Sequence, residues 1–283
     1  MRISLYKSLM SIFLTGFLVV GCKPATKNIS ENDILFDTIT VDKTYLLLGN
    51  KHNPDCNLQI KLVYPVKAAN KKLLQLIQQQ FIHSYFGEQY DSFTPEKAVE
   101  RYVEEYLANY KSLEDDFKAE EEDEGENHDH SLFSHYETSS NEIVYNCNNL
   151  ISYAISLERY TGGAHGAHSF LYRVIHLKTG APVTEEDIFI DNYQDGLAQL
   201  LVDKIAAQNG VKDAKELETI GFFSVDEIFP NANFLIDGEG ITYCFNEYEI
   251  AAYVVGATKV HLPYKEIRHL LREESPITQF IDN

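Results

Sequence analysis

The chain has 283 residues, of which 44% are hydrophobic and 12% aromatic; this predicts one large or two small globular domains and excludes a largely disordered protein. Its net charge is −19, and the sequence has no basic stripe with interleaved aromatic residues. A surface this acidic repels nucleic-acid phosphates, so we predict no nucleic-acid partner and a preference for cationic ones.

The N-terminus has the pattern of a lipoprotein signal peptide. Two basic residues, Arg2 and Lys7, precede the apolar run LMSIFLTGFLVV, which is too short to span a bilayer. A glycine stands directly before Cys22. This resembles the bacterial lipobox, in which the cysteine is acylated and becomes the mature N-terminus. We therefore predict a signal peptide over residues 1–21, lipidation of Cys22 and a polar tether over residues 22–32. An ordinary signal peptide or a short anchor is the alternative.

The predicted lipid anchor places the mature protein in the cell envelope, on a membrane surface. Removal of residues 1–21, with their two basic and no acidic side chains, brings the net charge to about −21. Lys23 follows Cys22 where the inner-membrane retention signal of enteric bacteria has Asp. This difference favours the outer membrane, on its periplasmic or surface face, where the source has one.

The first half of the mature chain predicts strands followed by helices. Two β-branched or alternating segments, residues 37–48 and 57–65, are typical of strands. Apolar residues at helical spacing then predict a helix within VKAANKKLLQLIQQQFIHSYFGE, which Gly87 could close. Thr94 as N-cap and Pro95 as the first helical residue open a long amphipathic helix. We assign residues 33–131 to an N-terminal strand and helix subdomain.

The second half, residues 132–283, begins with a run of predicted strands that extends to residue 178. In LISYAISLERY apolar side chains alternate with small polar ones, which predicts an antiparallel sheet with one covered face. A helix in YQDGLAQLLVDKIAAQNG, a hairpin with DGEG as its turn and a last strand before Pro263 follow. The whole order predicts an α+β fold, with antiparallel sheets packed against a few helices and a long amphipathic helix in the N-terminal half. The C-terminal α+β subdomain holds the GGAH hairpin.

The segment ERYTGGAHGAHSF, residues 158–170, is the strongest candidate site. Gly162 and Gly163 suit a tight turn between two strands, and this interpretation needs no ligand. A recognition surface is the second interpretation, and its predicted binding residues are Tyr160, Gly162, Gly163, His165 and, further along the chain, Tyr248. A metal or catalytic role for the histidines is the third, but no HExxH helix, nucleophile elbow or phosphate-binding loop accompanies them. We therefore predict no catalytic residue, metal ligand or cofactor.

Three cysteines remain besides Cys22, and an odd number cannot all pair within one chain. In an oxidising compartment we expect one disulfide, between Cys56 and Cys147. Three buried free thiols are the alternative.

Two stretches resemble a known family. YTGGAHGAHSFLYRVIHLKTGAPVTEEDIF and ITYCFNEYEIAAYVVGATKVHLPYKEI are similar to motifs of the extracytoplasmic domain shared by the anti-sigma factor RsiV and the non-catalytic region of the peptidoglycan deacetylase PdaC. The resemblance covers roughly residues 45–270. It is carried by Tyr160, Gly162, Gly163, Ala164, His165, Phe245, Tyr248, Glu249, Ile250, Ala251, Tyr253, Gly256, Pro263 and Tyr264.

The resemblance implies an α+β domain without catalytic residues of its own. In RsiV this domain recognises lysozyme, and a cationic lysozyme suits the acidic surface of this chain. We therefore predict a lipid-anchored envelope protein that binds a protein or a cell-wall glycan. The alternatives are an envelope hydrolase or deacetylase-associated enzyme acting on polysaccharide, and an envelope assembly factor.

Overall fold

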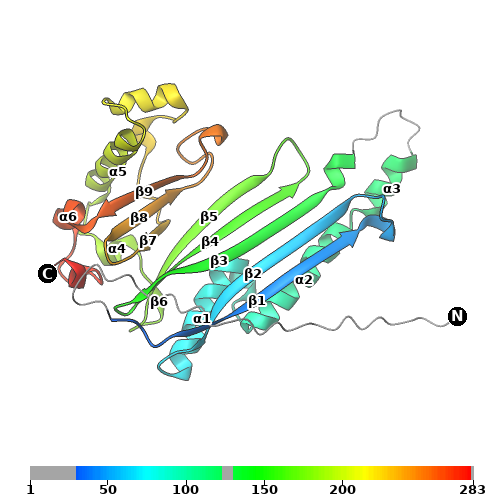
Figure 1. The fold of residues 1–283 in the computed structure, drawn as a ribbon, viewed down its shortest axis with the longest axis horizontal. Helices are drawn as coiled ribbons and strands as arrows, with labels where there is room; N and C mark the ends of the chain where they lie inside the picture. The colour runs from blue at the N-terminus through cyan, green and yellow to red at the C-terminus, as the bar shows by residue number, and fades with distance from the viewer. Residues whose placement is uncertain (1–29, 123–129, 282–283) are drawn as a thin grey trace.

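The computed structural model describes residues 30–122 and 130–281 and contains two β-sheets with helices around them (Figure 1). The six-stranded sheet consists of β1 (Leu35–Leu46), β2 (Asp55–Lys67), β3 (His135–Cys147), β4 (Leu150–Thr161), β5 (Ala167–His176) and β6 (Ala181–Pro182). The three-stranded sheet consists of β7 (Phe234–Ile236), β8 (Gly240–Phe245) and β9 (Thr258–Pro263). The helices are α1 (Lys71–Phe86), α2 (Pro95–Lys111), α3 (Glu114–Glu122), α4 (Glu185–Ile188), α5 (Gln194–Gln208) and α6 (Tyr264–Ile267). The predicted α+β class is thereby confirmed.

The strands of the six-stranded sheet follow the order of the chain. Neighbouring strands are antiparallel except β2 and β3, which pair in parallel. A parallel pair needs a long crossover connection, and α1, α2 and α3 all lie in the segment between these two strands. The sheet therefore includes strands from both sides of the predicted subdomain boundary at residues 131 and 132.

Of the crossover helices, α2 begins where the sequence predicts, at Pro95. The Asn70 side chain accepts a hydrogen bond from Leu73 N at 2.9 Å at the start of α1, and Thr94 caps α2 by accepting from Lys97 N. The predicted long amphipathic helix is confirmed over α2 and α3, with a bend between Lys111 and Glu114. Its apolar side chains, together with those of α1, pack against the apolar face of β2.

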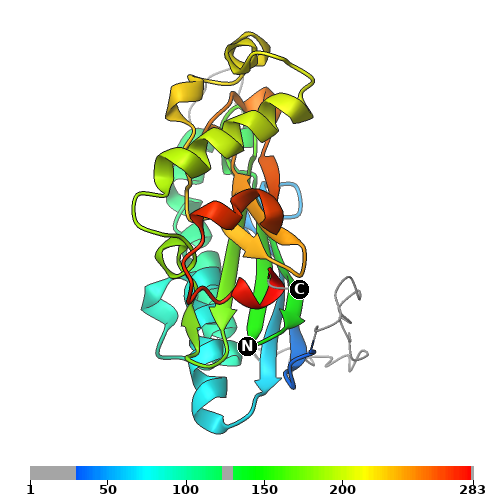
Figure 2. The same ribbon diagram turned by 90° about the vertical axis from the view of Figure 1, so that its left-hand side faces the viewer.

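Both faces of β4 are covered at its start, so the expectation of one covered face is wrong there. Tyr153 points to α1, where its ring stacks on Phe81 at a centroid distance of 4.1 Å. The neighbouring Ser152 points the other way and is fully buried, with its Oγ donating to Ile236 O at 2.5 Å. The cause is β7, which packs against this face of β4. In Figure 1 and in Figure 2 the three-stranded sheet and α5 lie higher on the molecule than α1. The small polar side chain thus marks close packing of a second sheet.

The predicted disulfide between Cys56 and Cys147 is wrong. Cys56 is a free, fully buried thiol. It pairs in register with His135 at the start of β3, whereas Cys147 is the last residue of that strand. Twelve residues of strand span about 40 Å at ~3.3 Å per residue, far beyond the ~7 Å limit between bridged Cα atoms.

None of the helices within residues 30–122 and 130–281 has the length and apolar character that crossing a bilayer requires. Cys22, the signal peptide over residues 1–21 and most of the tether over residues 22–32 lie outside the described residues.

Candidate functional site

The hairpin between β4 and β5 turns through the glycines that the sequence singles out. Gly162 has φ +86°, and a Cβ there would lie 2.8 Å from the carbonyl oxygen of Leu132. Gly163 has φ +112° but faces open space. Tyr160 donates from its hydroxyl to Gly163 O at 2.8 Å and closes the turn. Three of the five predicted binding residues therefore build the turn.

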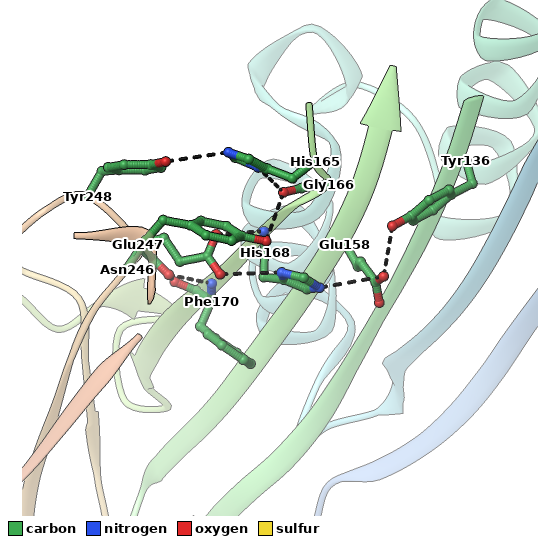
Figure 3. Close-up of polar contacts among 10 residues, drawn as sticks. Tyr136, Glu158, His165, Gly166, His168, Phe170, Asn246, Glu247 and Tyr248 are labelled. Atoms are coloured by element: carbon green, nitrogen blue, oxygen red, sulfur yellow. Dashed lines mark hydrogen bonds and ion pairs between the residues drawn. The ribbon is translucent and has the colours of Figure 1, made fainter. Parts of the chain in front are cut away.

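The other two predicted residues, His165 and Tyr248, meet on the surface. We call the group formed by the exposed His165 and Tyr248 and the half-buried Tyr253 the aromatic platform. The His165 ring stacks on Tyr253 at a centroid distance of 4.1 Å and an interplanar angle of 23°, and Tyr248 lies 5.8 Å from Tyr253 at 28°. Figure 3 shows the Tyr248 hydroxyl aimed at the His165 ring, with 3.4 Å between the oxygen and Nε2.

Hydrogen bonds hold the imidazole in one orientation. His165 Nδ1 lies 2.8 Å from Gly166 O, a group that can only accept. In the neutral ring Nδ1 therefore carries the proton and Nε2 accepts from Tyr248. Tyr253 donates from its hydroxyl to the same Gly166 carbonyl at 3.3 Å. These hydrogen bonds fix the relative positions of the three rings.

Tyr248 is held in a costly backbone conformation. Its φ is +64°, and 57% of the residue is exposed. A left-handed conformation costs a residue with a Cβ about 1–2 kcal/mol, so the surrounding loop must impose it. Glu249 does so by accepting hydrogen bonds from Asn246 N at 2.8 Å and from Asn231 Nδ2 at 3.0 Å. Such strain is typical of functional sites.

The loop over residues 246–256 is anchored to β5. Asn246 accepts from Phe170 N at 2.6 Å and donates to Phe170 O at 3.1 Å, so its side chain pairs with the strand as a backbone would. The Lys259 ammonium lies 4.2 Å from the centre of the Phe170 ring. These contacts fix Tyr248 and Tyr253 beside the hairpin.

A second histidine joins two carboxylates next to the platform. His168 lies with Nε2 3.5 Å from Glu158 Oε1 and with Nδ1 3.3 Å from Glu247 Oε1. Tyr136 donates to Glu158 at 3.0 Å, and the hydrogen bond is the main reason for the raised pKa of this tyrosine. Figure 3 shows this chain of contacts running from β3 across β4 and β5 to the 246–256 loop.

The two histidines of the motif, His165 and His168, therefore contact different kinds of side chain. His165 contacts aromatic rings, while His168 contacts carboxylates. Within residues 30–122 and 130–281, no three His, Cys, Asp or Glu side chains are grouped as metal ligands. The arrangement offers ring faces and negative charge to a partner.

Sequence reasoning missed two members of this surface. Tyr253 stands in the second family motif, five residues after Tyr248, and its place in that motif is the only signal for it. Glu247 lies next to Tyr248 in the sequence but is indistinguishable there from the many other acidic residues. Its contact with His168 joins residues 79 positions apart.

Exposed apolar side chains extend the surface. Val254 is 88% exposed, and Phe223 is 41% exposed. Backbone hydrogen bonds from Phe223 N to Ile250 O and from Ala252 N to Gly221 O tie the segment around Phe223 to the platform loop. Apolar side chains gathered in this way, rimmed by charges, are typical of interaction sites.

Two family models match the chain. The model described as Deacetylase PdaC matches residues 51–168, and the model described as a protein of unknown function (DUF3298) matches residues 186–265. The aromatic platform thus combines His165 from the first matched segment with Tyr248 and Tyr253 from the second. No curated protein matches the chain.

Solved structures agree with the family models. The structure of a DUF3298 family member from Bacteroides fragilis NCTC 9343 has 31% sequence identity and a TM-score of 0.83, and the match covers 89% of this chain and 99% of that one. A DUF3298 family protein from Pseudomonas aeruginosa PAO1 shares the fold, with 14% identity, a TM-score of 0.56 and coverage of 84% and 95%. The predicted resemblance is confirmed, and the chain belongs to the DUF3298 family, with a PdaC-like segment before its DUF3298 segment.

Proposed function

We propose that this protein is a lipid-anchored binding protein of the cell envelope, and that its aromatic platform recognises a cationic protein of the lysozyme type. The observation that carries the proposal is the stacked group of His165, Tyr248 and Tyr253 on the surface, next to the contacts of His168 with Glu158 and Glu247. Anchoring through Cys22 and an outer-membrane location are parts of the proposal that rest on the sequence.

The platform suits a partner that presents arginine or lysine. Aromatic ring faces attract such cations by about 0.5–2 kcal/mol each. The carboxylates of Glu158 and Glu247 add charge attraction at the same place. At a net charge of −19, the chain as a whole also draws cationic partners toward it and speeds their association.

The fixed positions of the platform side chains favour tight binding of a partner protein. Tyrosine is enriched among the residues that dominate binding energy at protein interfaces. Because hydrogen bonds already hold His165 and Tyr253 on the Gly166 carbonyl, little side-chain freedom is lost when a partner docks.

The test is a binding measurement on the mature chain from residue 22 with Cys22→Ser, which prevents acylation. Immobilised protein is titrated with a panel of lysozymes, other basic proteins and cell-wall glycans. We expect saturable binding of at least one lysozyme, weakened roughly 10–30-fold by Tyr248→Ala or His165→Ala, which corresponds to about 1.4–2 kcal/mol. His83→Ala is the matched control, because His83 is an exposed histidine on α1 with its own carboxylate partner, Asp91.

Unchanged lysozyme affinity in both platform variants would overturn the proposal. The proposal would also be overturned if a glycan bound saturably at the platform and no basic protein did. Melting temperatures of the variants must stay close to that of the parent chain, which separates lost contacts from lost folding.

The alternative envelope enzyme gains no support from the platform. His165 is exposed, and its ring nitrogens contact the Gly166 carbonyl and the Tyr248 hydroxyl. The nearby carboxylates of Glu158 and Glu247 contact His168 instead.

A further inference from the structure

A pocket of about 270 Å³ lies between the crossover helices and the six-stranded sheet. His165, Tyr248 and Tyr253 do not line it, but Phe170 and Asn246, which anchor the platform loop, do. Ser84 and Tyr85 of α1 and Tyr102 of α2 line it on one side, and Glu137, Ser139 and Ser169 line it on the sheet side. At about 30 Å³ per water molecule it has room for roughly nine waters. It is slightly smaller than the usual ~300–1,000 Å³ of small-molecule sites.

The pocket exists because β3 presents polar residues where apolar ones would fill the core. Glu137, Ser139 and Asn141 are each only 5% exposed on the strand face that meets the helices. Asn141 has a structural role, because it accepts from Val63 N at 2.7 Å and donates to Val63 O at 2.8 Å. Among the residues that the structure describes, Glu137 has no comparable set of backbone partners, and its side chain accepts only from Tyr102. A buried carboxylate is costly unless its hydrogen bonds are made.

Hydrogen-bonding capacity is left over on the pocket wall. Tyr102 donates to Glu137 Oε1 at 2.6 Å, but Glu137 Oε2 has no hydrogen bond among the described residues. Tyr85 donates to Ser139 Oγ at 3.0 Å, which leaves the Ser139 hydroxyl proton free to donate. The Ser169 hydroxyl has no hydrogen bond within the described part of the chain either.

Charge and shape narrow the class of ligand. The carboxylate of Glu137 disfavours an anion. Burial raises the pKa of the Glu137 carboxyl, against the smaller lowering effects of the hydrogen bond from Tyr102 and of the charge on Arg159, which lies opposite it in the strand register. A ligand made only of positive charge would leave the Ser139 and Ser169 hydroxyl donors unused. The side chains of Ile155, Leu157 and Leu171 add an apolar wall.

We propose that this pocket binds one uncharged sugar ring. Ring hydroxyls donate to Glu137 Oε2 and accept from Ser139 and Ser169, while the ring's C–H face lies on Leu157 and its apolar neighbours. The volume admits a single ring, held as one terminal or side residue of a larger glycan or as a free monosaccharide.

The test uses the mature Cys22→Ser chain and ligand-observed NMR with glucose, N-acetylglucosamine and mannose, each alone. We expect one of them to bind with a dissociation constant on the order of 1 mM, because so small a ligand has few contact atoms. Glu137→Gln is expected to weaken binding about tenfold by removing a charge-assisted hydrogen bond. Ser169→Leu fills the pocket and is expected to abolish binding.

Glu142→Gln is the matched control, since Glu142 lies on β3 but on the exposed face, and it should leave affinity unchanged. His165→Ala should also leave sugar affinity unchanged, so the pocket and the platform fail or succeed separately. Ser169 is partly exposed, so the Ser169→Leu variant is expected to fold. It therefore still tests the pocket if the Glu137→Gln variant fails to fold. The proposal is overturned if no sugar binds at tens of millimolar, if Ser169→Leu binds normally, or if 1,5-diaminopentane binds in place of every sugar.

Discussion

Replacing Gly162 with alanine should destabilise the protein more than the same change at Gly163. Both glycines have left-handed φ angles, +86° and +112°, which cost a residue with a Cβ about 1–2 kcal/mol. Only at Gly162 does the new Cβ also meet backbone, at 2.8 Å from Leu132 O. Relieving such a contact in a packed structure costs about 1–3 kcal/mol. We therefore expect a loss of about 2–5 kcal/mol for Gly162→Ala and about 1–2 kcal/mol for Gly163→Ala.

Thermal unfolding followed by circular dichroism measures this difference. For a domain of this size 1 kcal/mol shifts the melting temperature by about 2–4 °C. The Gly162→Ala variant should melt roughly 4–20 °C below the parent chain, and Gly163→Ala roughly 2–8 °C below it. Equal melting temperatures of the two variants would refute the reasoning, because the contact with Leu132 would then have no energetic weight.

Three further predictions concern buried groups. The buried Glu185 carboxylate accepts hydrogen bonds from Tyr193 Oη at 2.7 Å, Tyr243 Oη at 3.0 Å and Ala232 N at 3.0 Å. Glu185→Ala should therefore lower the free energy of unfolding, measured in urea, by about 3–5 kcal/mol, while Glu186→Ala should lower it by less than about 1 kcal/mol. Burial raises the pKa of Cys56 and of Cys244 to about 11, so both thiols should resist labelling by a maleimide at pH 7 in the native protein and react quickly in urea; fast native labelling would contradict their burial. Burial also raises the pKa of Glu137, so this carboxyl binds its proton more tightly in the folded state than in the unfolded state. The free energy of unfolding of the parent chain should therefore fall as pH rises from about 4.3, the ordinary pKa of glutamate, through the raised pKa. The stability of Glu137→Gln relative to the parent should accordingly increase over that pH range and then level off, and a flat difference would show that the carboxyl is not desolvated.

Local signals in the sequence predicted most of the elements. Thr94 and Pro95 marked the start of α2. Such signals lie within four residues of one another and need no knowledge of the rest of the chain. The helical spacing of apolar residues in α1 is likewise a local signal, which predicts the helix without predicting which strands it packs against.

Pairings between distant segments could not be predicted in the same way. The parallel pairing of β2 with β3 depends on the long crossover, and Ser152 is buried only because β7 packs against it. The choice of Cys147 as the partner of Cys56 failed for a related reason, since both lie in strands but at opposite ends of the sheet.

The candidate site was predicted in part. The sequence singled out His165 and Tyr248, and the structure brings these two side chains together although 83 positions separate them. It did not predict that Tyr253 stacks on the imidazole, or that Glu247 reaches His168. In so acidic a chain, no local pattern distinguishes the two carboxylates beside the platform from the others.

Hydrogen–deuterium exchange on the mature chain, alone and with a saturating lysozyme, tests the proposed function most directly, because it locates the partner on the surface. If the aromatic platform is the binding site, amides of residues 160–168 and 246–256 should gain protection together, with little change along β1 at the far edge of the sheet. Protection confined to β1 or to the helices, with both platform segments exchanging as in the free protein, would contradict the account.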